Sequence, residues 1–159
     1  MKKNVLVSGL IGFLAGIILF GVVAFVAAPS VMIVEDASPL GYEETVQAIL
    51  DSSAEQGWKV PKTYALDAAV EEAGYDVLPV TVIELCQPDH AGQVLLEDDA
   101  RIVTSLMPCR ISVYTTSTGD VIISRMNTGL ISKVFGGTVA EVMARASAEN
   151  EVILSAVLP

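Results

Sequence analysis

The sequence has little of the residues from which most catalytic and metal sites are built. It holds one histidine, two cysteines and one tryptophan in 159 residues. It has no Cys-x-x-Cys redox motif, no Cys-x-x-Cys-His haem-attachment motif and no Gly-x-Ser-x-Gly hydrolase elbow. Its length excludes a multidomain enzyme and a multi-span transporter. The sequence therefore names no reaction, and an enzyme is the less favoured interpretation.

Positive charge is also scarce, and it is unevenly placed. The chain has 9 basic and 19 acidic residues, a net charge of −10. All 19 acidic residues follow Val34 but only seven basic ones do, so this part carries 7 − 19 = −12. Without a basic surface, nucleic acid is not an expected partner. We expect the charge to serve solubility, with a basic soluble protein as a further candidate partner.

Charge is missing altogether from the 24 residues Val5–Ala28. As a helix they would measure about 36 Å, enough to cross a hydrocarbon core of about 30 Å. Roughly 64 of the other 135 residues are hydrophobic, about 47%, which is ordinary for a globular domain. We therefore expect a stub at 1–4, a transmembrane helix at 5–28 in the lipid bilayer, and one domain at 29–159.

A cleaved signal peptide is the alternative for this segment. Its apolar run is longer than the roughly 7–15 residues of a signal peptide, and Pro29 would follow the best cleavage site. Lys2 and Lys3 precede the helix, and the next basic residue is Lys59. The positive-inside rule then puts the N-terminus in the cytoplasm and the domain in the periplasm of a bacterium, on a single-pass anchor in the inner membrane.

Three small residues, Ser8, Gly12 and Gly16, recur at four-residue spacing on one face of this helix. Such rows allow two membrane helices to approach closely. They predict helix packing, in a homodimer or with other subunits of a membrane complex, although glycine is also simply common in membrane helices.

The remaining pattern predicts an α+β domain, a two-layer α/β arrangement with a mixed sheet of about five strands. Glycine, proline and turn residues separate the elements, and Thr138 with Glu141 forms a capping-box pattern. The expected strands are 31–34, 58–60, 77–85, 102–107 with 110–115, and 121–126 after a turn at 117–120. The expected helices are 42–56, 66–73, 88–97 and 138–154.

Two short motifs resemble a known family. Leu85-Cys86-Gln87-Pro88, followed by Ala91 and Leu95, is similar to the Cys-Asn-Pro-x-x-Ala-x-x-x-Leu motif of the domain-of-unknown-function 302 (DUF302) family. Leu106-Met107-Pro108-Cys109 and the run to Tyr114 resemble its Leu-Pro-Cys strand. Gln87 departs from the usual asparagine. The resemblance covers about residues 31–155 and implies a small α/β domain, often dimeric, without an established activity.

Cys86 and Cys109, one in each motif, are the candidate thiols or ligands. Cys86 comes where a strand ends and a helix begins with Pro88, and a helix N-terminus can lower a thiol pKa. Cys86 could be a redox thiol, a sulfur acceptor or a metal or haem ligand, or simply a small buried side chain. In an oxidising compartment the pair must be bridged as a disulfide or buried, and both alternatives stay open.

His90 is the third candidate ligand, four residues after Cys86. The favoured interpretation is an exposed histidine in the first turn of a helix. Two ligands do not make a structural zinc site, although Asp89 or Met107 could join them. The identity of any metal or cofactor is therefore unknown.

Other candidates are weaker. Gly136-Gly137-Thr138 precedes a helix without the Lys-Ser of a phosphate-binding loop, and a plain loop is favoured. Glu97-Asp98-Asp99 lacks the spacing of a calcium loop, and a solvated turn is favoured. Met107, Met126 and Met143 are expected in the core.

Three functions remain. We expect a membrane-anchored accessory or interaction subunit that is part of a membrane complex. The alternative is a thiol-dependent or metal- or haem-dependent redox or sulfur-handling protein using Cys86 and Cys109. A ligand-binding domain with a pocket between sheet and helices is the third hypothesis.

Overall fold

The computed structural model describes the backbone of residues 2–158 and the side chains of residues 9–158. The chain divides into two compact units, Met1–Met32 and Ile33–Pro159. The first is helix α1, Lys2–Met32, which starts before and ends after the expected 5–28. Among the described residues, Gly9–Met32 is the one helix long and apolar enough to cross a membrane, with a mean hydropathy of 2.8. By composition it could equally be a signal sequence.

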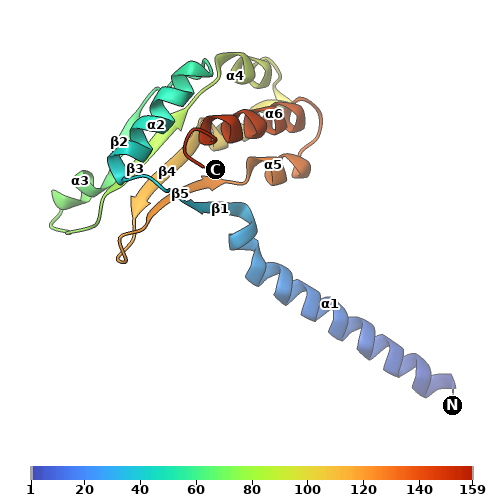
Figure 1. Cartoon of the computed structure of the whole chain (residues 1–159). Helices are drawn as coiled ribbons and strands as arrows, with labels where there is room; N and C mark the ends of the chain where they lie inside the picture. The colour runs from blue at the N-terminus through green and yellow to red at the C-terminus, as the bar shows by residue number, and fades with distance from the viewer. Residues whose placement is uncertain (1, 159) are drawn as a thin grey trace. The chain divides into compact units, whose positions relative to one another are not determined.

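The second unit is an α+β domain built on a five-stranded sheet, as expected. Its strands are β1 (Ile33–Ala37), β2 (Thr63–Ala65), β3 (Val80–Leu85), β4 (Cys109–Thr115) and β5 (Val121–Met126), in the order β1-β5-β4-β3-β2 (Figure 1). Every neighbouring pair is antiparallel, so the expectation of a mixed sheet was wrong in that detail. The segment after β3 returns at the same end of the sheet, because Leu85 pairs with Cys109, and such a return makes strands antiparallel.

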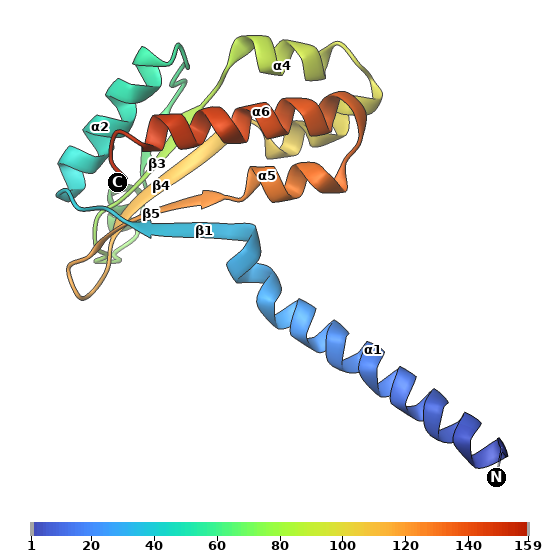
Figure 2. The same cartoon turned by 45° about the vertical axis from the view of Figure 1, so that its right-hand side comes forward.

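Helices α2 (Tyr42–Glu55) and α6 (Gly137–Leu154) cover one face of this sheet (Figures 1 and 2). Between them and the strands lies the sheet core, a cluster of buried side chains from the sheet, α2, the segment after α2, and α6 with the residues after it. Its members are Ile49, Trp58, Ile83, Leu85, Ile111, Val113, Ile123, Ala146, Ile153, Leu154 and Val157.

A second buried group, the cavity cluster, lies farther along α6. It joins α6 to α4 (Pro88–Leu95) and to the 3-10 helix η1 (Asp99–Leu106). Its members are Val94, Ala100, Val103, Val139, Val142 and Met143. The N-terminal half of α6 thus packs against one cluster and its C-terminal half against the other.

The shorter elements correct several expectations. Residues 58–60 form no strand of their own; Lys59 instead makes an isolated bridge with Cys86. Residues 102–107 belong mostly to η1 rather than to a strand. Helices α3 (Leu66–Glu71), α5 (Thr128–Ile131) and η2 (Ser132–Val134) complete the domain, and the last two were not expected. Asn127 starts α5 because its Oδ1 accepts a hydrogen bond from the Leu130 amide at 3.0 Å.

The expected cap of α6 was wrong. The helix begins after Gly136, which has no side chain to cap it, and the Thr138 hydroxyl donates to Glu97 Oε1 at 2.8 Å instead. The turn at 117–120 was right: Gly119 lies at φ +90°, where only glycine fits easily, and the Thr116 amide donates to the Asp120 carbonyl at 2.9 Å.

Candidate functional site

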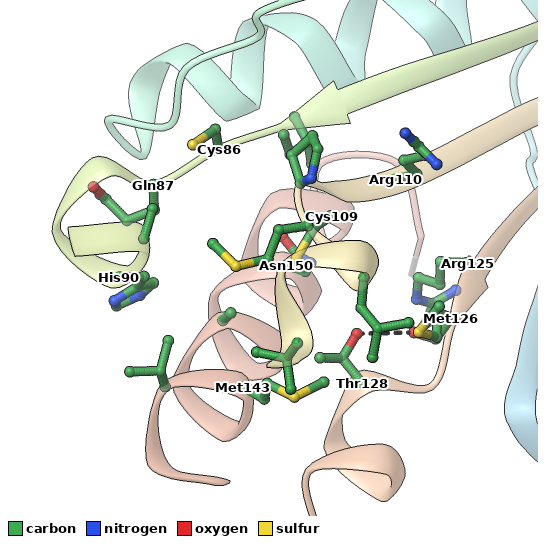
Figure 3. A pocket seen from close by; sticks show the side chains of 18 of the residues that line it. Cys86, Gln87, His90, Cys109, Arg110, Arg125, Met126, Thr128, Met143 and Asn150 are labelled. Atoms are coloured by element: carbon green, nitrogen blue, oxygen red, sulfur yellow. Dashed lines mark hydrogen bonds between the residues drawn. The ribbon is translucent and has the colours of Figure 1, made fainter. Parts of the chain in front are cut away.

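A cavity of about 380 Å³ lies at the end of the sheet where β3 stops and β4 starts. Its walls come from α4, α6, η1 and the adjoining strand ends, and Figure 3 shows their side chains. Most lining residues are apolar, including Val94, Val103, Val142 and Ala146. Both candidate thiols and His90 line this same cavity. The three chemical candidates of the sequence are therefore brought to one place.

Cys86 is held at the junction of β3 and α4. Its backbone exchanges two 2.9 Å hydrogen bonds with Lys59. Gln87 then caps α4, because its side-chain oxygen accepts from the Asp89 amide at 3.2 Å, and Pro88 occupies the first helical position as expected. The glutamine in place of the family's asparagine therefore still caps the helix.

Cys109 opens β4 and is partly buried. It lies opposite Leu85 in the sheet, and Cys86 is the next residue after Leu85. Side chains alternate between the two faces of a strand, so Cys86 and Cys109 project to different sides although their backbones are close. A disulfide needs Cβ atoms that face each other. The alternation accounts for the two free thiols in the structure.

The environment of Cys109 favours the protonated thiol. Burial raises the pKa of Cys109 above its ordinary value, Cys86 raises it further, and the Asn150 side chain partly opposes this by lowering it. The thiolate is the reactive form of cysteine. Cys109 is therefore a weaker nucleophile at neutral pH than an ordinary cysteine.

His90 is not an exposed first-turn residue, which corrects the expectation. Its side chain is only 12% exposed, and its Nε2 lies 3.0 Å from Glu149 Oε1 on α6. Trp58 donates its indole N–H to the other oxygen, Oε2, also at 3.0 Å. The Trp58 and His90 rings pack edge to face, with their centroids 5.9 Å apart. One carboxylate thus fixes both rings at the cavity wall.

Two polar atoms at this cavity have no partner. Among the described residues, the buried side-chain atoms without a hydrogen bond are Asp67 Oδ1, His90 Nδ1 and Asn150 Oδ1. The last two belong to residues that line the cavity, and Asn150 is only 8% exposed. An unsatisfied buried polar atom costs about 1–3 kcal/mol. Native proteins leave few such atoms without a water or a ligand.

Neither Asn150 nor Glu149 was predicted as part of the site. A signal existed for Asn150, because it lies in the apolar pattern of the helix 138–154, four residues after Ala146 and three before Ile153. An amide at such a position is either paired or functional. Nothing in the sequence indicated that Glu149 would join Trp58 to His90.

The charged side chains that line the cavity are already paired. Arg125, with its side chain 10% exposed, contacts Asp36 Oδ2 at 2.6 Å and Glu151 Oε2 at 2.9 Å. These two partners raise the pKa of Arg125, although burial alone would lower it. Arg110 contacts Glu84 Oε1 at 3.0 Å.

In the described part of the chain, no group of three or more His, Cys, Asp and Glu side chains is placed to hold a metal ion. Met107 does line the cavity with Cys86 and His90, but Asp89 is not among its lining residues.

The weaker candidates have local partners. Glu97 accepts the hydrogen bond of Thr138, beside Gly136 and Gly137, and Asp98 Oδ1 pairs with Arg101 at 2.6 Å. In α1, space is open within 4 Å of where a Cβ would stand on Gly12 and Gly16. The side chain of Ser8, the third residue of that row, lies outside the described residues.

The fold and cavity define a small α+β domain of the type expected from the two cysteine motifs. The family described as "Domain of unknown function DUF302" matches residues 34–157, so the chain belongs to this family. Its structure is similar to the crystal structure of an uncharacterized conserved DUF302 protein from Bacillus stearothermophilus, with a TM-score of 0.69 and 23% identity over 79% of this chain and 98% of that one. No curated protein matches.

Proposed function

We propose that this protein is a membrane-anchored accessory subunit whose outer domain binds a small, largely apolar molecule in the cavity at the end of the sheet. The observation that carries the binding role is the pair of partnerless polar atoms, Asn150 Oδ1 and His90 Nδ1, which belong to residues that line one mostly apolar cavity. Concave apolar sites with a few convergent polar groups are typical of ligand pockets.

The size of the cavity supports a ligand larger than a solvent molecule. Its volume of about 380 Å³ falls within the roughly 300–1,000 Å³ usual for small-molecule sites. An apolar cavity of about 150 Å³ is enough to take benzene. A molecule of one or two rings would therefore fill this site.

The anchor is the second part of the proposal. Helix α1 would hold the domain at the bacterial inner membrane, with Lys2 and Lys3 in the cytoplasm and the acidic domain in the periplasm. Its glycine row would pack against a second copy or another subunit. The charge of −12 after Val34 would favour a basic soluble protein as a transient partner.

A redox or sulfur-handling role for Cys86 and Cys109 is the second candidate. The observation in its favour is that both thiols line the cavity. Against it, burial raises the pKa of Cys109, and the side-chain alternation opposes a direct disulfide. Binding without thiol chemistry therefore accounts for more of the site.

The sole tryptophan gives a direct test of binding. Trp58 is 4% exposed, lines the cavity and touches His90, so its fluorescence is sensitive to this site. The full chain in dodecyl maltoside micelles would be titrated with toluene, cyclohexanol and phenol, with excitation at the red edge of the indole band. We expect a saturable change in Trp58 emission with at least one probe.

The control is Val142→Phe, which places a larger ring at the cavity wall from a residue that is 5% exposed. Partition of a probe into the micelle affects both proteins equally, whereas occupation of the cavity occurs only in the unmodified chain. A response that persists in the variant, or no response to any probe up to its solubility limit, contradicts the binding role.

The accessory role is tested by native gels of detergent-extracted membranes. We expect migration in a complex with other subunits, and replacement of Gly12 and Gly16 by leucine should reduce it. Migration only as a free monomer or dimer would rule out a larger complex.

A further inference from the structure

We infer that the ligand is an uncharged aromatic molecule carrying hydrogen-bond donors, of which a phenol or a hydroquinone is the simplest kind. This inference rests on the proposed binding role of the cavity and specifies the chemistry that the cavity accepts. It is carried by the pairing of every charged group on the wall, by the lack of a hydrogen-bond partner for two buried polar atoms of its lining residues, and by the atoms that form the apolar surface.

The absence of spare charge argues for a neutral ligand. Three cavity-lining side chains are cationic or can become so, namely His90, Arg110 and Arg125, and each contacts a carboxylate at 3.0 Å or less. An anionic ligand would have to compete with Glu149, Glu84 or Asp36 for them. No acidic side chain lines the cavity to receive a cation. A charged ligand would thus lose its hydration without gaining an ion pair.

The two partnerless atoms call for donors on the ligand. Asn150 Oδ1 is a carbonyl oxygen and can only accept. His90 Nε2 lies 3.0 Å from a carboxylate oxygen, which accepts, and in the tautomer with its proton on Nε2 the Nδ1 atom is an acceptor. A ligand with O–H or N–H groups supplies the hydrogen bonds that these two atoms lack within the protein.

The walls favour an aromatic ring. All the cysteines and methionines between positions 33 and 158 line this cavity, and they are Cys86, Met107, Cys109, Met126 and Met143. Figure 3 shows Cys109 beside Asn150 and Met143 farther along the same wall. Divalent sulfur makes favourable contacts with aromatic rings, about 0.3–1.5 kcal/mol each, and methionine adapts its shape to a flat ligand. The Trp58 ring adds a further aromatic surface.

The test compares four matched compounds on the full chain in dodecyl maltoside micelles, read by Trp58 fluorescence with Val142→Phe as the partition control. Phenol has both features, anisole lacks the donor, cyclohexanol lacks the aromatic ring, and benzoate carries a charge. We expect phenol to bind most tightly, anisole and cyclohexanol about tenfold more weakly, and benzoate not at all.

Asn150→Leu removes the acceptor at nearly constant volume and should bring the affinity for phenol down to that for anisole, with anisole unchanged. The ligand series on the unmodified chain needs no variant, so it decides the question even when Asn150→Leu does not fold. Equal affinities for phenol and anisole overturn the donor requirement, equal affinities for phenol and cyclohexanol overturn the aromatic one, and tight benzoate binding overturns neutrality. In each of these cases the proposed binding role stands; only the failure of all four compounds contradicts it.

Discussion

The two buried clusters differ in how completely they are filled, although one helix, α6, serves both. The sheet core contains Ile49, Ile83, Ile111, Val113 and Ile123, all at 0% exposure. The cavity cluster is smaller, and four of its six members line the cavity (Val94, Val103, Val142 and Met143), against three of the eleven in the sheet core (Trp58, Leu85 and Ala146). Close packing stabilises a fold, whereas a retained cavity forgoes contacts. If the proposed binding role holds, the sheet core supplies stability and the cavity cluster supplies most of the binding surface.

Truncation of a buried side chain in the sheet core should have the largest effect on stability. Ile83→Ala removes a side chain with no solvent exposure and leaves a new cavity, at a cost of about 2–5 kcal/mol in the free energy of unfolding. Val103→Ala, beside the existing cavity, should cost less. Urea unfolding of the full chain in micelles, followed by Trp58 fluorescence, measures both. Equal losses would remove the distinction between the two clusters.

Replacing a buried side chain by a larger one should also distinguish the two clusters. Val113→Phe overfills the sheet core and should lower the free energy of unfolding by about 1–3 kcal/mol. Val142→Phe has room in the cavity and should leave stability nearly unchanged while abolishing the binding of phenol. Thermal melts of the two variants, side by side, provide the comparison. A strong destabilisation by Val142→Phe would mean that the cavity cluster is packed as tightly as the sheet core.

Cys109, which packs against the sheet core and lines the cavity, should show a shifted titration. In a Cys86→Ser background, its alkylation by iodoacetamide should need a higher pH than the roughly 8.5 of an ordinary thiol, because burial raises its pKa. At a pH below the ordinary thiol pKa, each unit by which the pKa is raised lowers the thiolate fraction about tenfold. The alkylation rate falls in proportion. The same variant in urea is the control, and a folded-state profile that matches it would contradict the shift.

The sign of the linked effect on stability follows from the same pKa. The unfolded chain loses the Cys109 proton at a lower pH than the folded one, so the folded state binds more protons over that interval. The contribution of Cys109 to stability is therefore fully present below the ordinary thiol pKa and is lost as the pH rises toward the folded-state value. Cys109→Ala should flatten this alkaline decline.

The smallest effect is expected away from both clusters. The Tyr114 hydroxyl donates to Glu35 Oε1 at 2.7 Å in an exposed hydrogen bond, which raises the pKa of Tyr114. Tyr114→Phe should change the free energy of unfolding by less than about 0.5 kcal/mol, since water replaces the lost partner. A thermal melt of the variant would detect a larger change, which would show that this face contributes to stability as the sheet core does.

The regular parts of the fold were predictable because each has a local signature. The charge-free run predicted α1, the apolar and β-branched run 77–85 predicted β3, and Gly119 marked the turn between β4 and β5. The prediction of a strand at residues 102–107 was wrong. Ile102 and Val103 favour strands by propensity, but the tertiary packing of Val103 against α6 selects a 3-10 helix. Intrinsic propensity determines the secondary structure only where tertiary packing does not favour another conformation.

The site was predictable only in part. Cys86, Cys109 and His90 could be identified from two motifs, and they do line one cavity. The partners Glu149 and Asn150 come from a helix about 60 residues after His90, and sequence spacing carries no information on such distant contacts. The antiparallel register, which separates the two thiols to opposite faces, is likewise a property of the assembled sheet.

The shared helix has a consequence for how a bound molecule would act on the whole domain. Because α6 seals the sheet core with Ile153 and Leu154 and walls the cavity with Val142 and Met143, the helix cannot detach from one cluster without disturbing the other. Occupation of the cavity is then linked to global unfolding rather than to a local loosening. A ligand at one hundred times its dissociation constant would add about 2.7 kcal/mol to the stability of the entire domain.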